Sequence, residues 1–74
     1  MEVDVELSAR NQLPATVRTV KYGAVMAEVV VTLDDGGQEI VSVITEESAR
    51  RLGLEPGRKV VAVIKSTEVL LGTV

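Results

Sequence analysis

Several residue types are missing from this chain of 74 residues, and each absence excludes a class of function. The sequence contains no cysteine and no histidine. This excludes disulfide bonds, thiol chemistry and a Cys/His zinc site, and it removes the commonest general base. Phenylalanine and tryptophan are also absent, and there is a single tyrosine. Because a domain of this size buries only a thin core and has no disulfide, we expect association between copies to stabilise it.

The chain also lacks a long apolar run. No stretch approaches the roughly 20 apolar residues that span a bilayer. The first residues, MEVDVEL, alternate between apolar and acidic side chains, and they match neither a signal peptide nor an amphipathic anchor. We therefore expect a cytoplasmic protein that does not contact a membrane.

Acidic residues outnumber basic ones, eleven to eight, and the formal net charge is −3 at pH 7. Nucleic-acid-binding proteins draw much of their affinity from basic patches that neutralise phosphates. Here the lysines and arginines are scattered, and Tyr22 is the only aromatic side chain on which a base can stack. Composition therefore disfavours a nucleic-acid-binding barrel, and an anion bound by this chain must be small and held by local donors.

What the sequence does contain is a strong β-strand signal, carried by fifteen valines. The expected strands span residues 2–8, 13–22, 24–33, 38–44, 59–65 and 68–71. The Asp-Asp-Gly-Gly stretch at 34–37 predicts a hairpin turn. Residues 45–57 have a helix pattern instead, with Thr45 as N-cap, acidic residues in the first turn and arginines in the last. The pattern predicts a single all-β domain over residues 1–74 with one short helix, folded as a small five- to six-stranded barrel of the oligonucleotide-binding (OB) type.

Two of these strands carry more apolar surface than one barrel interior requires. Residues 29–31 are three consecutive valines, and residues 60–64 are all apolar. A small barrel normally exposes one polar face of each strand. Either loops and the helix cover the outer faces or another subunit does, and the shortness of the chain favours an oligomer.

Three short clusters of hydrogen-bond donors interrupt the apolar pattern. The clusters are Ser8, Arg10 and Asn11; Thr45 and Ser48; and Lys65, Ser66 and Thr67. Hydroxyls, backbone N–H groups and cations suit a compact tetrahedral oxyanion, whereas a metal cation requires converging carboxylates. Each cluster also has a purely structural explanation: a surface ion pair for the arginine, a helix cap for the threonine and serine, and a solvated strand end for the lysine. The adjacent carboxylates of Glu46, Glu47 and Glu68 repel an anion unless they point away.

Four motifs, in chain order, resemble the molybdenum-pterin-binding (Mop) domain of the molbindin family. They are SARNQL at 8–13, GAVMAEV at 23–29, VITEESARRLGLEPG at 43–57 and VAVIKSTEVLLG at 61–72. Because they cover nearly the whole chain, it resembles the single-domain molbindins. The resemblance implies an OB-like barrel, a homohexamer built as a trimer of dimers, and binding sites between subunits. It also implies cytoplasmic storage and homeostasis of molybdate, with tungstate as a chemical mimic and no metal cation.

The same resemblance assigns residues to the oxyanion site. The family's contacts fall on residues of the three donor clusters and on one backbone group: Ser8, Arg10, Thr45, Ser48, Ile64 through its backbone, Lys65 and Ser66. Secondary contacts are expected from Ala9, Asn11 and Thr67. The chain departs from the family at two positions, with Ala15 where glycine is frequent and Met26 where asparagine is frequent. Met26 exchanges a polar group for an apolar one, so a site that uses that asparagine is not carried over.

Two further interpretations belong to other classes of protein. A domain of this kind that assembles without binding a ligand would be a scaffold, and it would show no heat of binding with any oxyanion. An enzyme is least favoured, because without histidine and cysteine the remaining candidates are carboxylates and lysines, and no pair of them has an informative spacing. We expect an oxyanion-binding protein without catalytic residues.

Overall fold

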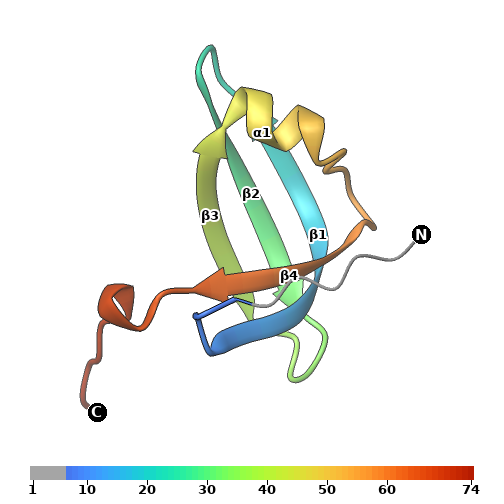
Figure 1. The fold of residues 1–74 in the computed structure, drawn as a ribbon. Coiled ribbons are helices and arrows are strands. Elements are labelled where there is room, and N and C mark those ends of the chain that lie inside the picture. Colours follow the sequence, from blue (N-terminus) through green and yellow to red (C-terminus); the bar gives the residue numbers. More distant parts are fainter. Residues whose placement is uncertain (1–6) are drawn as a thin grey trace.

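The computed structural model describes residues 7–74, which form one curled sheet with a short helix at one end (Figure 1). The elements follow in the order β1 (Asn11–Tyr22), β2 (Met26–Leu33), β3 (Glu39–Thr45), α1 (Glu46–Arg51), β4 (Lys59–Ile64) and the 3₁₀-helix η1 (Ser66–Glu68). The prediction of a mostly β fold with one short α-helix is confirmed. Over the described range, no helix has the length and apolarity needed to cross a membrane.

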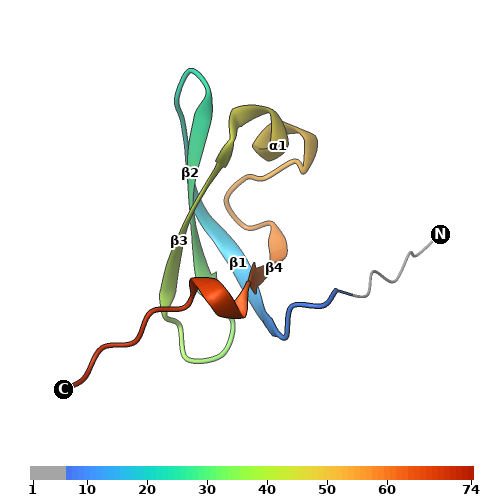
Figure 2. The same cartoon turned by 60° about the vertical axis from the view of Figure 1, so that its left-hand side comes forward.

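The four strands form an antiparallel sheet in the order β3-β2-β1-β4. The long β1 pairs with β4 along its first half and with β2 along its second. A register shift between Val17 and Thr19 bends β1, as bulges do. The sheet therefore curls, and β4 runs across the open side of the other strands (Figures 1 and 2). Gly36 and Gly37, both with positive φ, close the turn predicted at 34–37.

The core lies on the concave side of the curled sheet. Alternate residues of β1 and β2 supply it: Ala15, Val17, Val29 and Val31 form a buried cluster. Ala49 of α1 is fully buried and holds the helix against the sheet. Ala15 needs no positive φ, which no non-glycine residue of the described chain adopts, so alanine is accommodated where the family often has glycine.

The expected strand at 68–71 is wrong. Glu68 belongs to η1, and the residues after it pair with no strand. This segment runs away from the sheet (Figures 1 and 2), and its Leu70 and Leu71 side chains are 93% and 94% exposed. A strand requires a neighbour for its backbone hydrogen bonds, and the described chain offers none here. The apolar composition of this segment therefore predicts a strand, but the strand does not form without a partner.

The remaining boundaries agree to within a few residues. The expected strand at 2–8 lies almost entirely outside the described residues, and its last two positions, 7 and 8, are not in a strand. Residues 7–74 therefore contain four strands, fewer than the five to six expected for the whole barrel. The helix occupies the first half of 45–57, with Thr45 as its N-cap as predicted, and it ends before Gly53, whose φ is positive.

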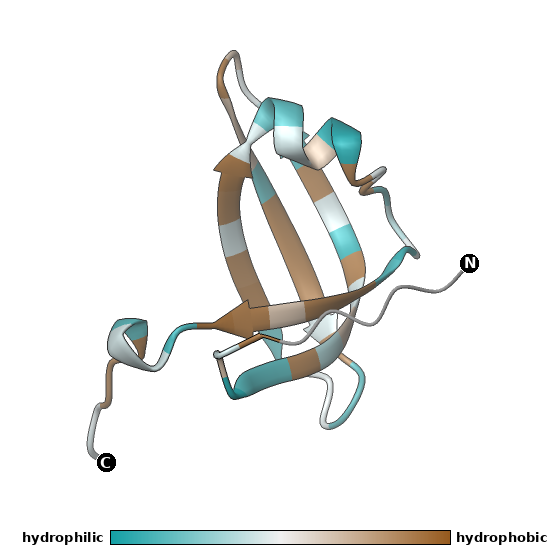
Figure 3. Cartoon of the chain, in the orientation of Figure 1, coloured by the Kyte–Doolittle hydropathy of each residue, from teal (hydrophilic) through white to brown (hydrophobic). Residues whose placement is uncertain are grey.

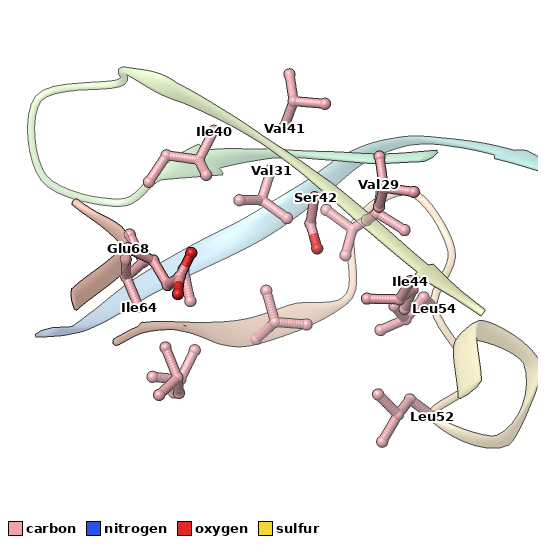
Figure 4. A pocket seen from close by; sticks show the side chains of 16 residues that line it. Val29, Val31, Ile40, Val41, Ser42, Ile44, Leu52, Leu54, Ile64 and Glu68 are labelled. Atoms are coloured by element: carbon pink, nitrogen blue, oxygen red, sulfur yellow. The ribbon is translucent and has the colours of Figure 1, made fainter. Parts of the chain in front are cut away.

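An apolar groove of about 660 Å³ opens between β3 and β4, the two edge strands of the sheet. Its lining is almost entirely aliphatic, as Figures 3 and 4 show for these strands. Val41, Val43 and Val61 at its margins are 60%, 61% and 56% exposed. Loops and α1 therefore leave these apolar faces uncovered. An exposed apolar patch of this kind is typical of a site that contacts another molecule.

Candidate functional site

Two of the three predicted donor clusters lie side by side, where β1 begins and β4 ends. A small hollow of about 150 Å³ is lined by Ser8, Ala9, Lys65, Ser66 and Thr67. The strand register explains this arrangement. Asn11 is paired with Ile64, so the residues before Asn11 run beside those that follow Ile64. The hollow thus combines hydroxyls from both segments with one ammonium group.

Lys65 stands where β4 stops and the chain turns into η1. Its backbone is extended, and its carbonyl accepts a hydrogen bond of 2.9 Å from the Glu68 N–H. The lysine and Arg10 are both exposed. Neither forms an ion pair with another residue between 7 and 74, so a surface salt bridge does not account for the arginine in that range. Two cations therefore stand at this end of the sheet with no carboxylate bound to them there.

Thr45 and Ser48 cap α1, which is the structural role predicted for them. The Ser48 N–H donates to Thr45 Oγ1 at 3.1 Å, and the Thr45 hydroxyl donates to Ser48 Oγ at 2.7 Å. A further N–H of the first turn, that of Glu46, donates to the Val25 carbonyl at 2.8 Å. Thr45 is exposed and Ser48 is half-buried, so both hydroxyls remain accessible from outside while they serve the helix.

Of the three carboxylates expected to repel an anion, one is paired with an arginine and one faces away from the hollow. Glu46 is paired with Arg50 one turn along the helix, and the guanidinium lies 4.3 Å from the centroid of the Tyr22 ring. The hydrogen bond to Glu46, followed by its charge, raises the pKa of Arg50 above its ordinary value. Glu68 faces the apolar groove rather than the hollow (Figure 4). Two of the three nearby negative charges are thus neutralised or directed elsewhere.

The helix cluster and the hollow lie at opposite ends of the sheet. Thr45 pairs with Met26 beside the far end of β1, whereas Ile64 pairs with Asn11 at its start. The 12 residues of β1 separate them, which is about 36 Å measured along a strand. One copy of the chain therefore cannot surround a single small anion with all three clusters. The apolar side chain of Met26, 43% exposed, stands next to the helix cluster.

Gln12, which contacts a residue of the hollow without lining it, is a residue that the sequence reasoning did not single out. Its side-chain amide donates a 2.7 Å hydrogen bond to the Ala9 carbonyl, in a wall of the hollow. The signal was present in the motif at 8–13, where Gln12 follows the donors directly.

Cation ligands are not gathered anywhere in the described part of the chain: it contains no group of three or more Asp, Glu, His or Cys side chains placed to hold a metal ion.

The sequence and the fold of this chain are both similar to those of known proteins. The sequence model of the TOBE domain matches residues 7–71. Molybdenum-pterin-binding protein 3 of Clostridium pasteurianum is 45% identical over 67 residues, which make up 90% of this chain and 97% of that protein.

Two solved structures share both sequence and fold. A molybdate-binding protein from Sporomusa ovata is 40% identical with a TM-score of 0.86, over 93% of this chain and 100% of the other. The cytoplasmic molybdate-binding protein ModG, with molybdate bound, is 52% identical with a TM-score of 0.80, over 84% of this chain and 43% of that one. The chain therefore belongs to the TOBE domain family, in its group of molybdenum-pterin-binding (Mop) proteins.

Proposed function

We propose that this protein binds molybdate, and its mimic tungstate, at sites shared between copies of a homo-oligomer. The observation that carries the proposal is the division of the donors between the two ends of one chain. The hollow beside Lys65 and the helix cluster at Thr45 are each an incomplete cage for a tetrahedral anion. Relatives described as molybdenum-pterin-binding and molybdate-binding proteins support molybdate as the ligand.

In this proposal, one subunit contributes the hollow with Lys65 and the neighbouring Arg10, and another contributes the helix cluster. The ligand contacts of the first subunit come from Ser8, Arg10, the Ile64 backbone, Lys65 and Ser66, and those of the second from Thr45 and Ser48. Ala9, Asn11 and Thr67 add secondary contacts. Hydrogen bonds from the two cations to an oxyanion are charge-assisted and therefore stronger than bonds between neutral groups.

Size separates molybdate from sulfate. A cage of donors set for the larger anion leaves long hydrogen bonds to the smaller one, and hydrogen bonds weaken steeply as their geometry worsens. Phosphate is disfavoured as well if the hydroxyls of the cage all donate to the anion, because no acceptor then remains for the phosphate proton. The proposed role is storage and homeostasis of the oxyanion in the cytoplasm, with no chemical step.

The oligomer is proposed to be a homohexamer, arranged as a trimer of dimers. The open groove between β3 and β4 supports association, as do the exposed valines beside it and the exposed leucines that follow η1. Covering apolar surface of this extent is the usual source of stability for a subunit interface. The acidic net charge and the single tyrosine provide no comparable support for a nucleic-acid partner.

The direct test is calorimetric titration with molybdate in the presence of excess sulfate, after native mass spectrometry has fixed the mass of the assembly. We expect saturable heat and a number of sites that relates simply to the number of subunits. A well-formed oligomer that gives no heat with molybdate or tungstate would contradict the binding function and would identify the protein as a scaffold.

Replacing Ser48 with alanine separates helix capping from ligand binding. Ser48→Ala removes a hydroxyl but keeps the backbone N–H that the Thr45 cap accepts, so we expect the free energy of unfolding to change by less than about 0.5 kcal/mol. Molybdate affinity is expected to fall about five- to tenfold, the effect of one lost hydrogen bond. Chemical denaturation and calorimetry measure the two effects. Thr45→Ala is the comparison, because loss of the helix cap costs about 1 kcal/mol of stability in addition to any loss of affinity. If Ser48→Ala binds molybdate as tightly as the unaltered protein, Ser48 does not belong to the site.

A further inference from the structure

We propose that Gln12 is a positioning residue for the oxyanion site, and that it holds residues 8–10, here named the 8–10 loop, against the end of β4. The inference rests on the proposed function, because it concerns how one half of that site is kept in shape. Gln12 does not line the hollow itself. It acts on the loop that does.

Gln12 belongs to β1 and pairs with Val63, two residues before Lys65. Its side-chain Nε2 donates to the Ala9 carbonyl at 2.7 Å, and its backbone N–H donates to the Arg10 carbonyl at 3.0 Å. One strand residue therefore binds two consecutive carbonyls of the loop. Because the strand itself is fixed by its ladder to β4, these two bonds tie the loop to the element that ends in the lysine.

The 8–10 loop needs such a restraint. It belongs to no helix or strand, and Ser8 and Arg10 are exposed. A loop of this kind samples several conformations, and the entropy lost when an anion selects one of them is subtracted from the binding free energy. A clamp that orders the loop beforehand increases affinity without touching the ligand.

The clamp also fixes the orientation of one peptide group. The described peptide bonds are all trans, and a trans peptide directs its C=O and its N–H to opposite sides. With the Ala9 carbonyl bound by Gln12, the N–H of Arg10 is turned away from the Gln12 side chain. The Ala9 carbonyl oxygen is thereby kept away from the oxyanion, which it would repel.

The test is Gln12→Met, which keeps the length of the side chain and removes its donor. Gln38→Met is the matched control, since Gln38 is exposed, follows the 34–37 turn and makes no side-chain hydrogen bond to residues 7–74. Backbone order parameters and the Ala9 carbonyl chemical shift are measured by NMR in the ligand-free protein, and molybdate affinity is measured by calorimetry. Gln12→Glu is a second variant for the NMR measurements, which keeps the shape and replaces the donor with an acceptor; its affinity is not compared, because its added negative charge repels an anion by itself.

We expect Gln12→Met and Gln12→Glu to lower the order of residues 8–10 and to shift the Ala9 carbonyl signal, and we expect Gln12→Met to weaken molybdate binding at least five- to tenfold. The order of β1 and β4 is expected to stay unchanged, and Gln38→Met is expected to match the unaltered protein in every measurement. An unchanged loop in both variants would overturn the inference, and so would weaker binding without a change in the loop. If the unaltered protein binds no molybdate, the proposed function fails, while the NMR comparison still decides whether Gln12 orders the loop.

Discussion

Replacing Lys65 with alanine is expected to weaken molybdate binding roughly 30- to 150-fold while the assembly stays intact. The lysine is exposed where β4 ends, and among residues 7–74 it is the one cation that lines the hollow. A hydrogen bond from an ammonium to an anion contributes about 2–3 kcal/mol where it is shielded from water. Titration calorimetry of Lys65→Ala measures the loss, and native mass spectrometry measures the assembly.

Lys59→Ala is the control for this substitution. Lys59 lies at the other end of the same strand, where its ammonium contacts Thr16 Oγ1 at 2.8 Å and Asp34 Oδ1 at 3.4 Å. Removing it changes the net charge of the protein by the same amount, but it removes nothing from the hollow. We expect its molybdate affinity to stay within about twofold of the unaltered protein, because exposed charges at this distance are screened by salt. Equal losses in the two variants would mean that general charge attracts the anion, and collapse of the Lys65→Ala assembly would make that lysine structural.

Placing aspartates at both leucines after η1 is expected to dissociate the oligomer. Leu70 and Leu71 are almost fully exposed in the single chain, and burial of each contributes about 1.5–3 kcal/mol. The double variant Leu70→Asp, Leu71→Asp loses this contribution and adds two carboxylates, whose transfer into an apolar interface is costly. We expect the association constant of that contact to fall at least about a hundredfold. Native mass spectrometry over a dilution series measures this change as a loss of the full-size assembly.

The matched control adds the same charge three residues further on. Thr73→Asp with Val74→Asp leaves both leucines in place, so the assembly is expected to keep its mass. If the leucine variant also keeps its mass, the segment after η1 lies outside every subunit contact. Because the proposed site combines two subunits, the dissociated leucine variant is also expected to lose molybdate binding, although all of its proposed ligands remain. Full binding by a monomer would contradict the shared site.

The local features of this protein follow from neighbouring residues in the sequence. Thr45 caps the helix because its hydroxyl reaches an N–H three residues away, and the glycines of the 34–37 turn supply the positive φ that it requires. The valine-rich alternation makes strands wherever a partner is available. The absence of cysteine and histidine limits the chemistry of the chain whatever its fold. These interactions act over a few residues, so a sequence reveals them.

The placement of the three donor clusters was decided by the strand register. The pairing of Asn11 with Ile64 brings the 8–10 loop beside Lys65, and the pairing of Met26 with Thr45 puts the helix cluster at the opposite end of the sheet. Donor type was readable from the chain, but which donors meet depends on contacts between residues more than fifty positions apart. The two hydrogen bonds of Gln12 are short in sequence, yet their importance appears only once the loop they hold is seen to line the hollow.

Residues 68–71 show where sequence pattern stops being sufficient. Their composition is typical of a strand, and composition alone makes this segment extended and apolar. Whether such a segment becomes a strand depends on an unpaired edge within reach, because every backbone N–H and C=O withdrawn from water needs a partner. Within residues 7–74 the segment has no such partner, and β3 and β4 keep open edges on either side of an apolar groove. The sequence by itself determined the donors, the helix cap, the turns and the β-rich composition, because these depend on near neighbours. Only the tertiary structure decided which donors face one another and which apolar surfaces remain open, because these depend on long-range strand pairing.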